Sequence, residues 1–125
     1  MPTNRMSASY DDDTVEVTAT GDGNFDLELT IDTGTTDQEV VLAIDYSQLK
    51  LLFIHSDQAI TIETNADDAT GGQAISSAAD VPYCWWYGSG ITCPITDDVV
   101  TNIFITNASG STATIKIKGN YDSTL

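Results

Sequence analysis

Basic side chains are scarce in this sequence, and their scarcity limits the possible partners. Four lysines and arginines stand against 19 aspartates and glutamates, so the formal net charge is −15 at pH 7. Binding to nucleic-acid phosphates or anionic lipid headgroups needs clustered lysine and arginine. We therefore expect no nucleic acid and no membrane among the partners. Long hydrophobic runs are missing too: no run approaches the about 18 residues of a membrane span, and no hydrophobic stretch near the N-terminus predicts a signal peptide.

Residues for catalysis or metal binding are equally few. One histidine and two cysteines are too few ligands for a structural zinc site. Residues 55–57 (His-Ser-Asp) have the residue types of a hydrolase triad, but consecutive residues do not converge on one another. Residues 22–26 begin like a calcium-binding loop, but Leu27 and Thr33 stand where that loop needs glycine and glutamate. We expect no enzyme activity, no catalytic residue, no metal and no cofactor.

What the chain does contain is a series of short runs rich in valine, isoleucine, threonine and aromatic residues, separated by glycine, asparagine and aspartate. This pattern is typical of antiparallel all-β structure. Residues 25–32 are the clearest example, because apolar residues alternate there with acidic residues and threonine. We expect eight or nine strands, one helical turn at residues 46–49, and a single-domain antiparallel β-sandwich of jelly-roll or immunoglobulin-like type. A closed barrel is the alternative.

Some strands carry further expectations. Residues 40–44 and 51–54 are apolar without interruption, so each strand is covered on both faces or has one face in an interface. Residues 99–106 and 112–118 are predicted to form a final hairpin around a turn at residues 107–110. That turn contains an Asn-Ala-Ser sequon, which we interpret as turn chemistry.

The first 13 residues are polar and end in three adjacent aspartates. Because three neighbouring carboxylates repel one another, we expect residues 1–13 to form a flexible N-terminal arm and residues 14–125 to form the β-sandwich domain. The arm is expected to become ordered only against a neighbouring chain. Arg5 and Tyr10 are its candidate interface residues.

Two cysteines flank an aromatic segment. If Gly88 and Ser89 form a two-residue hairpin loop, Cys84 lies opposite Cys93 at a non-hydrogen-bonded pair, close enough for a disulfide. Two free, buried thiols are the alternative.

Trp85, Trp86 and Tyr87 lie within the same segment and are candidate interface residues. Adjacent residues of a strand point to opposite faces, so one tryptophan is expected in the core and the other on the surface. The two rings cannot form one flat stacking surface. Core packing, a protein–protein contact and a carbohydrate site remain open for these residues.

The second half of the chain contains a characteristic succession of strand-like segments. They are residues 49–54 (LKLLFI), 60–65 (ITIETN), 81–86 (VPYCWW), 103–109 (IFITNAS) and 113–117 (ATIKI). In this succession the chain resembles small all-β virion proteins of tailed bacteriophages, of the capsid decoration or cement type. The resemblance covers about residues 40–120, and the segment between Cys84 and Cys93 is not a feature of that group.

The resemblance implies a structural protein without enzymatic activity, located on the outer capsid surface of a virion. It implies two partners, the major capsid protein and further copies of this chain in a trimer or dimer. The uninterrupted apolar runs at residues 40–44 and 51–54 suit burial against another subunit. A tail or fibre domain, or a carbohydrate-binding β-sandwich that uses Trp85 or Trp86, is the alternative function.

Overall fold

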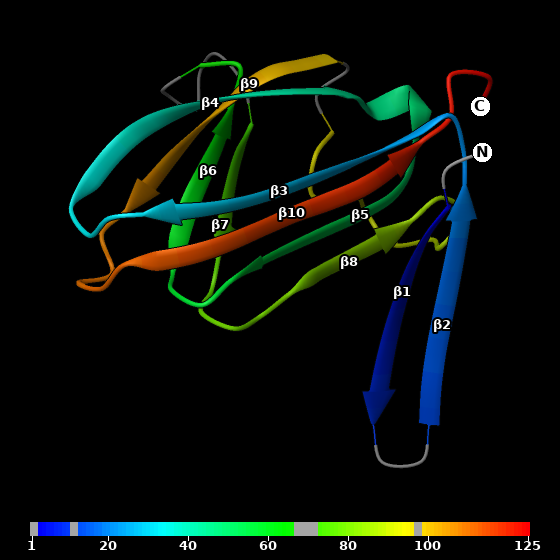
Figure 1. The fold of residues 1–125 in the computed structure, drawn as a ribbon, viewed down its shortest axis with the longest axis horizontal. Helices are drawn as coiled ribbons and strands as arrows, with labels where there is room; N and C mark the ends of the chain where they lie inside the picture. The colour runs from blue at the N-terminus through cyan, green and yellow to red at the C-terminus, as the bar shows by residue number, and fades with distance from the viewer. Residues whose placement is uncertain (1–2, 11–12, 67–72, 97–98) are drawn as a thin grey trace.

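The computed structural model describes residues 3–10, 13–66, 73–96 and 99–125, and these residues form ten antiparallel strands and one short 3-10 helix (Figure 1). In chain order the elements are β1 (Thr3–Tyr10), β2 (Asp13–Thr20), β3 (Gly23–Ile31), β4 (Thr35–Asp45), η1 (Tyr46–Gln48), β5 (Leu49–Ser56), β6 (Ile60–Thr64), β7 (Ala74–Ser77), β8 (Tyr83–Trp86), β9 (Val99–Asn107) and β10 (Ala113–Tyr121). Across the described residues, no helix has the length and hydrophobicity needed to cross a bilayer. The helical turn expected at residues 46–49 is confirmed by η1.

Eight of these strands form two four-stranded sheets with the orders β3-β10-β5-β8 and β4-β9-β6-β7. The sheets face each other across a shared hydrophobic core (Figure 1). The predicted all-β sandwich is therefore confirmed, but the described residues form ten strands in place of the expected eight or nine. β1 and β2 form a separate two-stranded hairpin.

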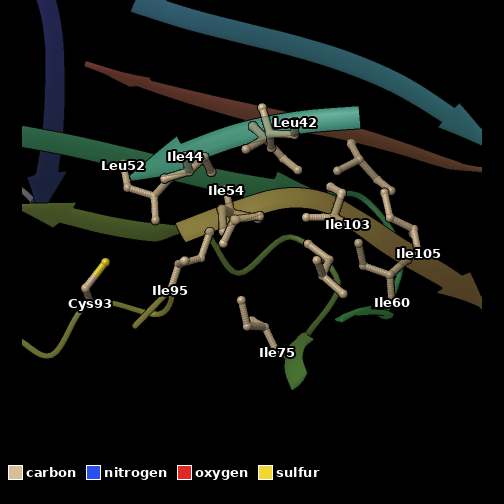
Figure 2. Close-up of a cluster of buried hydrophobic side chains, with 14 of the residues drawn as sticks. Leu42, Ile44, Leu52, Ile54, Ile60, Ile75, Cys93, Ile95, Ile103 and Ile105 are labelled. Atoms are coloured by element: carbon tan, nitrogen blue, oxygen red, sulfur yellow. The ribbon is translucent and has the colours of Figure 1, made fainter. Parts of the chain in front are cut away.

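The core consists mainly of isoleucine and leucine side chains from the inner faces of both sheets (Figure 2). Ile54 of β5 and Ile105 of β9 are almost completely buried, as is Ile62 of β6. Each such side chain contributes about 1.5–3 kcal/mol through its removal from water. Apolar and polar residues alternate along β3 and along residues 113–118 of β10, and the apolar ones are the more buried, so this sequence pattern fixes which face of each strand enters the core.

The predicted hairpin of residues 99–106 and 112–118 is wrong. β9 pairs with β4 and β6, whereas β10 pairs with β3 and β5, so the two strands lie in different sheets. The intervening turn carries the chain from one sheet to the other. Alternation of apolar and polar residues identifies a strand and its buried face but not its partner strand. The same alternation is compatible with a β9-β10 hairpin and with two strands in different sheets.

Asn107 holds this crossover in place. Its side chain is completely buried, and its Nδ2 donates to the carbonyl oxygens of Ile31 at 2.9 Å and Ser111 at 2.8 Å. Its Oδ1 accepts from the backbone N–H of Ser109 at 3.1 Å. The interpretation of the sequon as turn chemistry is confirmed.

The two uninterrupted apolar runs differ in their surroundings. In β4, Leu42 and Ile44 are buried, but the side chain of Val41 is 81% exposed, so one face of this strand is open. In β5, Leu51 and Leu52 are both buried although they point to opposite faces. Leu52 lies in the core, and Leu51 lies on the outer face of the sheet, beside the N-terminal hairpin.

The N-terminal hairpin projects from one end of the sandwich (Figure 1). β1 and β2 pair continuously, from Thr3 opposite Thr20 to Tyr10 opposite Asp13. The segment expected to be a loose arm thus contains a regular strand over residues 3–10, and most of its partner strand lies beyond the expected boundary at residue 13. The mobility of the arm in solution stays a prediction, and residues 1–2 and 11–12 lie outside the described residues.

Candidate functional site

A groove of about 440 Å³ lies between β1 and the outer face of the β3-β10-β5-β8 sheet. We call it the hairpin groove. The residues that line it come from three strands: Asn4, Arg5, Met6 and Ser7 of β1, Leu51, Phe53 and His55 of β5, and Lys116 and Lys118 of β10.

Strand alternation places the sheet residues of the hairpin groove. On β10, Ile115 and Ile117 enter the core, so Lys116 and Lys118 point outward. The same rule turns Leu51, Phe53 and His55 of β5 outward, opposite to Leu52 and Ile54 of the core. The register of the two strands sets Lys116 opposite His55 and Lys118 opposite Phe53, which gives a compact block of two cations, one imidazole and one phenyl ring.

The hairpin groove gathers most of the positive charge of an acidic protein. Three of the four lysines and arginines line it, together with the one histidine, and none of the described residues that line it is acidic. The fourth cation, Lys50, lies at the base of the hairpin, where its Nζ donates to the carbonyl oxygen of Thr20 at 2.6 Å. This distribution favours binding of a negatively charged ligand in the groove.

Acidic side chains pair with these cations from outside the groove. Oxygen atoms of Asp26 and Glu16 lie 3.6 Å from Lys118 Nζ and 3.7 Å from Arg5 Nη1, respectively. Exposed ion pairs of this kind contribute at most about 1 kcal/mol each. A carboxylate of a ligand can therefore replace Asp26 or Glu16 as the partner of these cations at little cost in free energy. Among the described residues, Lys116 forms no ion pair.

The floor of the hairpin groove is apolar. Leu51 is 1% exposed, and Phe53 is half-buried. The rings of Phe53 and His55 are stacked, with centroids 6.4 Å apart and planes inclined by 16°. A ligand that fits this site combines negative charge with at least one apolar group.

The hairpin that forms one wall is attached to the sandwich by polar contacts at its base. Asn4 Nδ2 donates to the carbonyl oxygen of Gly119 at 3.5 Å, and Asn24 Nδ2 donates to that of Thr3 at 3.3 Å. Gly21 joins the hairpin to β3, and a Cβ atom there would collide with the carbonyl oxygen of Tyr121. The junction thus needs glycine, which has no Cβ.

The predicted interface residues are not brought together. Arg5 lines the hairpin groove, whereas the side chain of Tyr10 lies outside the described part of the chain. Trp85 is buried, and its Nε1 donates to the carbonyl oxygen of Ile91 at 2.9 Å. Trp86 is half-buried and Tyr87 is 62% exposed. The expectation of one tryptophan in the core and one at the surface is confirmed.

The predicted Cys84–Cys93 hairpin and disulfide are wrong, because both cysteines are free. β8 ends at Trp86 and pairs with β5, which sets Cys84 opposite Phe53. Cys93 lies in a segment without strand structure. Residues 87–93 do not run back along β8 as a strand, and the indole N–H of Trp85 donates to the carbonyl oxygen of Ile91 within this segment. The alternative of two free thiols is the one found, and burial raises the pKa of both.

The three residues with the types of a hydrolase triad point to different partners. His55 Nε2 lies 3.4 Å from Asp80 Oδ1, Ser56 Oγ donates to the carbonyl oxygen of Gln58, and Asp57 accepts from the backbone N–H of Thr114. Within the described residues, no three acidic, histidine or cysteine side chains are grouped to hold a metal ion.

Sequence reasoning missed Phe53, His55, Lys116 and Lys118 as site residues. Their alternation with buried residues showed that they point outward, but not that β10 lies beside β5 or that β1 lies across them.

No protein-family model matches the chain, and no curated protein or solved structure matches it either. The geometry of the hairpin and its groove therefore carries the functional proposal.

Proposed function

We propose that this protein is a capsid decoration or cement protein, which attaches to the outer surface of a virion's major capsid shell and stabilises it without catalysing a reaction. The observation that carries the proposal is the projecting N-terminal hairpin, whose strands have eight residues each and reach about 25 Å. A two-stranded hairpin is only marginally stable alone in water. A hairpin held mainly at its base gains order when a partner surface covers it.

The charge of the molecule also supports attachment to protein. A net charge of −15 keeps free protein soluble and apart from nucleic acid before assembly. A local cationic site at the base of the hairpin then directs contact toward an acidic surface. Such attachment across adjacent capsid subunits would raise the free energy needed to separate them.

Further copies of this chain, in a trimer or dimer, belong to the same proposal. Val41 and Val99 are 81% and 56% exposed on the neighbouring strands β4 and β9. The register sets Val41 opposite Asn102 and Val99 opposite Asp45, so these are two separate apolar side chains on one sheet that a subunit contact would cover.

The alternative, a tail or fibre domain or a carbohydrate-binding module, has less support. Carbohydrate stacking would use Trp86, because Trp85 is buried in the core. Loss of glycan binding in Trp86→Ala would support this alternative.

The test compares virus particles with and without this protein. Particles stripped of it are expected to burst at a lower temperature and after a milder osmotic shock, and added wild-type protein is expected to restore them. Equal survival of stripped and complete particles would rule out the cement function.

Two proline variants test the role of the hairpin. Met6→Pro removes a backbone N–H in the middle of β1, and we expect it to abolish restoration while the sandwich stays folded. Thr3→Pro is the matched control, because proline is tolerated at the first residue of a strand. Restoration by Met6→Pro as complete as by Thr3→Pro would show that the hairpin is not the attachment element.

A further inference from the structure

We propose that the hairpin groove binds an extended acidic segment of a partner protein, which adds to the free edge of β1 as a third strand. This inference rests on the proposed function in one respect, namely that the partner is a protein. It adds the chemistry of the segment and the way in which the segment is held.

The first observation is the edge of β1. Asn4, Arg5, Met6 and Ser7 are consecutive and all line the groove. Since consecutive side chains of a strand point to opposite faces, the groove runs along the edge of β1 and not over one of its faces. Within the described residues β1 pairs with β2 alone, so its other edge is free for a further strand.

The second observation is the backbone of Arg5. Its N–H donates to Oδ1 of Asn4 at 2.9 Å. In an antiparallel pair the polar groups of alternate residues face the partner strand, so those of Arg5 and Ser7 face the free edge. The Asn4 side chain occupies the place that a carbonyl oxygen of an added strand would take.

The third observation is charge complementarity. Arg5 lies on β1, and Lys116 and Lys118 lie across the groove on β10. A segment between these walls meets cations on both sides, and its glutamate or aspartate side chains can pair with them. Strand addition supplies affinity through the main chain, while side chains supply specificity.

The apolar floor defines the remaining specificity. Leu51 and Phe53 lie beneath the path of the segment, so an aromatic or aliphatic side chain between the acidic residues would be removed from water there. The segment we infer alternates acidic and apolar residues and contains no proline at the paired positions.

The experiment uses the full-length protein and a fluorescein-labelled peptide, Gly-Glu-Phe-Glu-Leu-Glu-Thr-Gly, with fluorescence anisotropy as the readout. We expect saturable binding that weakens at high salt. Lys116→Gln is expected to weaken binding about tenfold through loss of a charge-assisted contact. Thr36→Glu is the matched control: it lowers the net charge equally from an exposed position on β4, in the other sheet, and is expected to bind like the wild type.

Two further probes separate strand addition from simple charge attraction. A peptide with the same charges and prolines in place of phenylalanine and leucine is expected not to bind, because proline removes backbone donors. Citrate is expected to compete weakly. Equal binding of the proline peptide, or competition by citrate as strong as by the unlabelled peptide, would overturn the proposal in favour of a plain carboxylate site.

Absence of peptide binding to the wild-type protein would also overturn it. Unfolding midpoints of the Lys116→Gln and Thr36→Glu proteins confirm that each is folded. Peptide binding is measured without particles, so its failure leaves the cement function standing if added protein still restores stripped particles. Conversely, peptide binding without any effect on particles would support the groove and contradict the cement function.

Discussion

Lys50 joins the sandwich to the N-terminal hairpin: its Nζ donates a hydrogen bond of 2.6 Å to the carbonyl oxygen of Thr20. Lys50 lies on β5, and Thr20 is the last residue of β2. The bond therefore fixes the point at which the hairpin leaves the sandwich, and with it the position of the wall formed by β1. The other cations line the hairpin groove itself.

Lys50→Met is expected to loosen the hairpin without unfolding the sandwich. Hydrogen bonds to charged groups contribute about 1.5–3 kcal/mol, and this exposed one belongs at the low end. Amide hydrogen exchange in β1 and β2 should become faster, while exchange in β9 stays slow. Lys116→Met is the control, because that side chain lies in the groove and not at the junction. Equal exchange rates in both variants would contradict a role for Lys50 at the junction.

Gly21→Ala is expected to destabilise the protein by about 1–3 kcal/mol, the usual cost of forcing extra atoms into a packed site. Its Cβ would meet the backbone of Tyr121, which cannot move aside like the end of a flexible side chain. Urea unfolding measures the loss. Gly110→Ala serves as the control: its φ is +91° and nothing lies near the added Cβ, so only backbone strain of about 1 kcal/mol is expected. A smaller loss for Gly21→Ala than for Gly110→Ala would refute the close contact.

The two thiols are expected to react slowly with a thiol reagent at neutral pH, since burial raises the pKa of Cys84 and of Cys93 and the thiolate is the reactive form. For Cys93 a backbone hydrogen bond with Ile95 acts in the opposite direction but is the smaller effect. Cys84 should react first because it is less buried. Mass spectrometry of the unreduced protein should find both thiols free, and a mass lower by two hydrogens would contradict this.

The raised pKa values also predict how stability depends on pH. The folded protein favours the neutral thiols more strongly than the unfolded chain does. Their contribution to stability is therefore fully present below the unfolded pKa, near 9.0, and is lost as the pH rises through the folded pKa. Replacement of both cysteines by serine should remove this alkaline loss from the unfolding curve, measured by circular dichroism.

The sequence predicted strands better than it predicted their partners. In β3, apolar and polar residues alternate so regularly that the buried face could be read directly. In β1 the alternation is weaker, because only Met6, Ala8 and Tyr10 interrupt a polar segment, and its pairing with β2 is visible only in the structure. The hairpin predicted for β9 and β10 was wrong for the same reason: alternation does not identify partner strands. The order of strands in space depends on contacts between residues that are distant in the sequence.

The candidate site was predicted only in part, for the same reason. Arg5 was identified as an interface residue, but Lys116 and His55 meet only because β10 pairs with β5. The cysteine pairing failed because the chain turns at Gly88 but residues 91–93 form no second strand beside β8. Outward-pointing cations in a very acidic chain were the one sequence signal that could have indicated the hairpin groove.

Asn107→Ala is expected to be among the most damaging single changes, with a loss of about 2–4 kcal/mol in the free energy of unfolding. The change leaves the carbonyl oxygen of Ile31 without its amide donor and the backbone N–H of Ser109 without its acceptor, and each unsatisfied buried group costs about 1–3 kcal/mol. The carbonyl oxygen of Ser111 is affected less, because it also accepts from the Ser109 hydroxyl. Asn107→Asp should be no better, because it places a charge in a completely buried position. Ser109→Ala is the matched control: it removes an exposed hydroxyl that donates to Asn107 Oδ1 and to the carbonyl oxygen of Ser111, but it leaves both amide donors of Asn107 in place and should cost less than about 1.5 kcal/mol. Urea unfolding decides between the two residues. If Ser109→Ala proved as costly as Asn107→Ala, the crossover between the sheets would depend on the turn itself and not on the amide of Asn107.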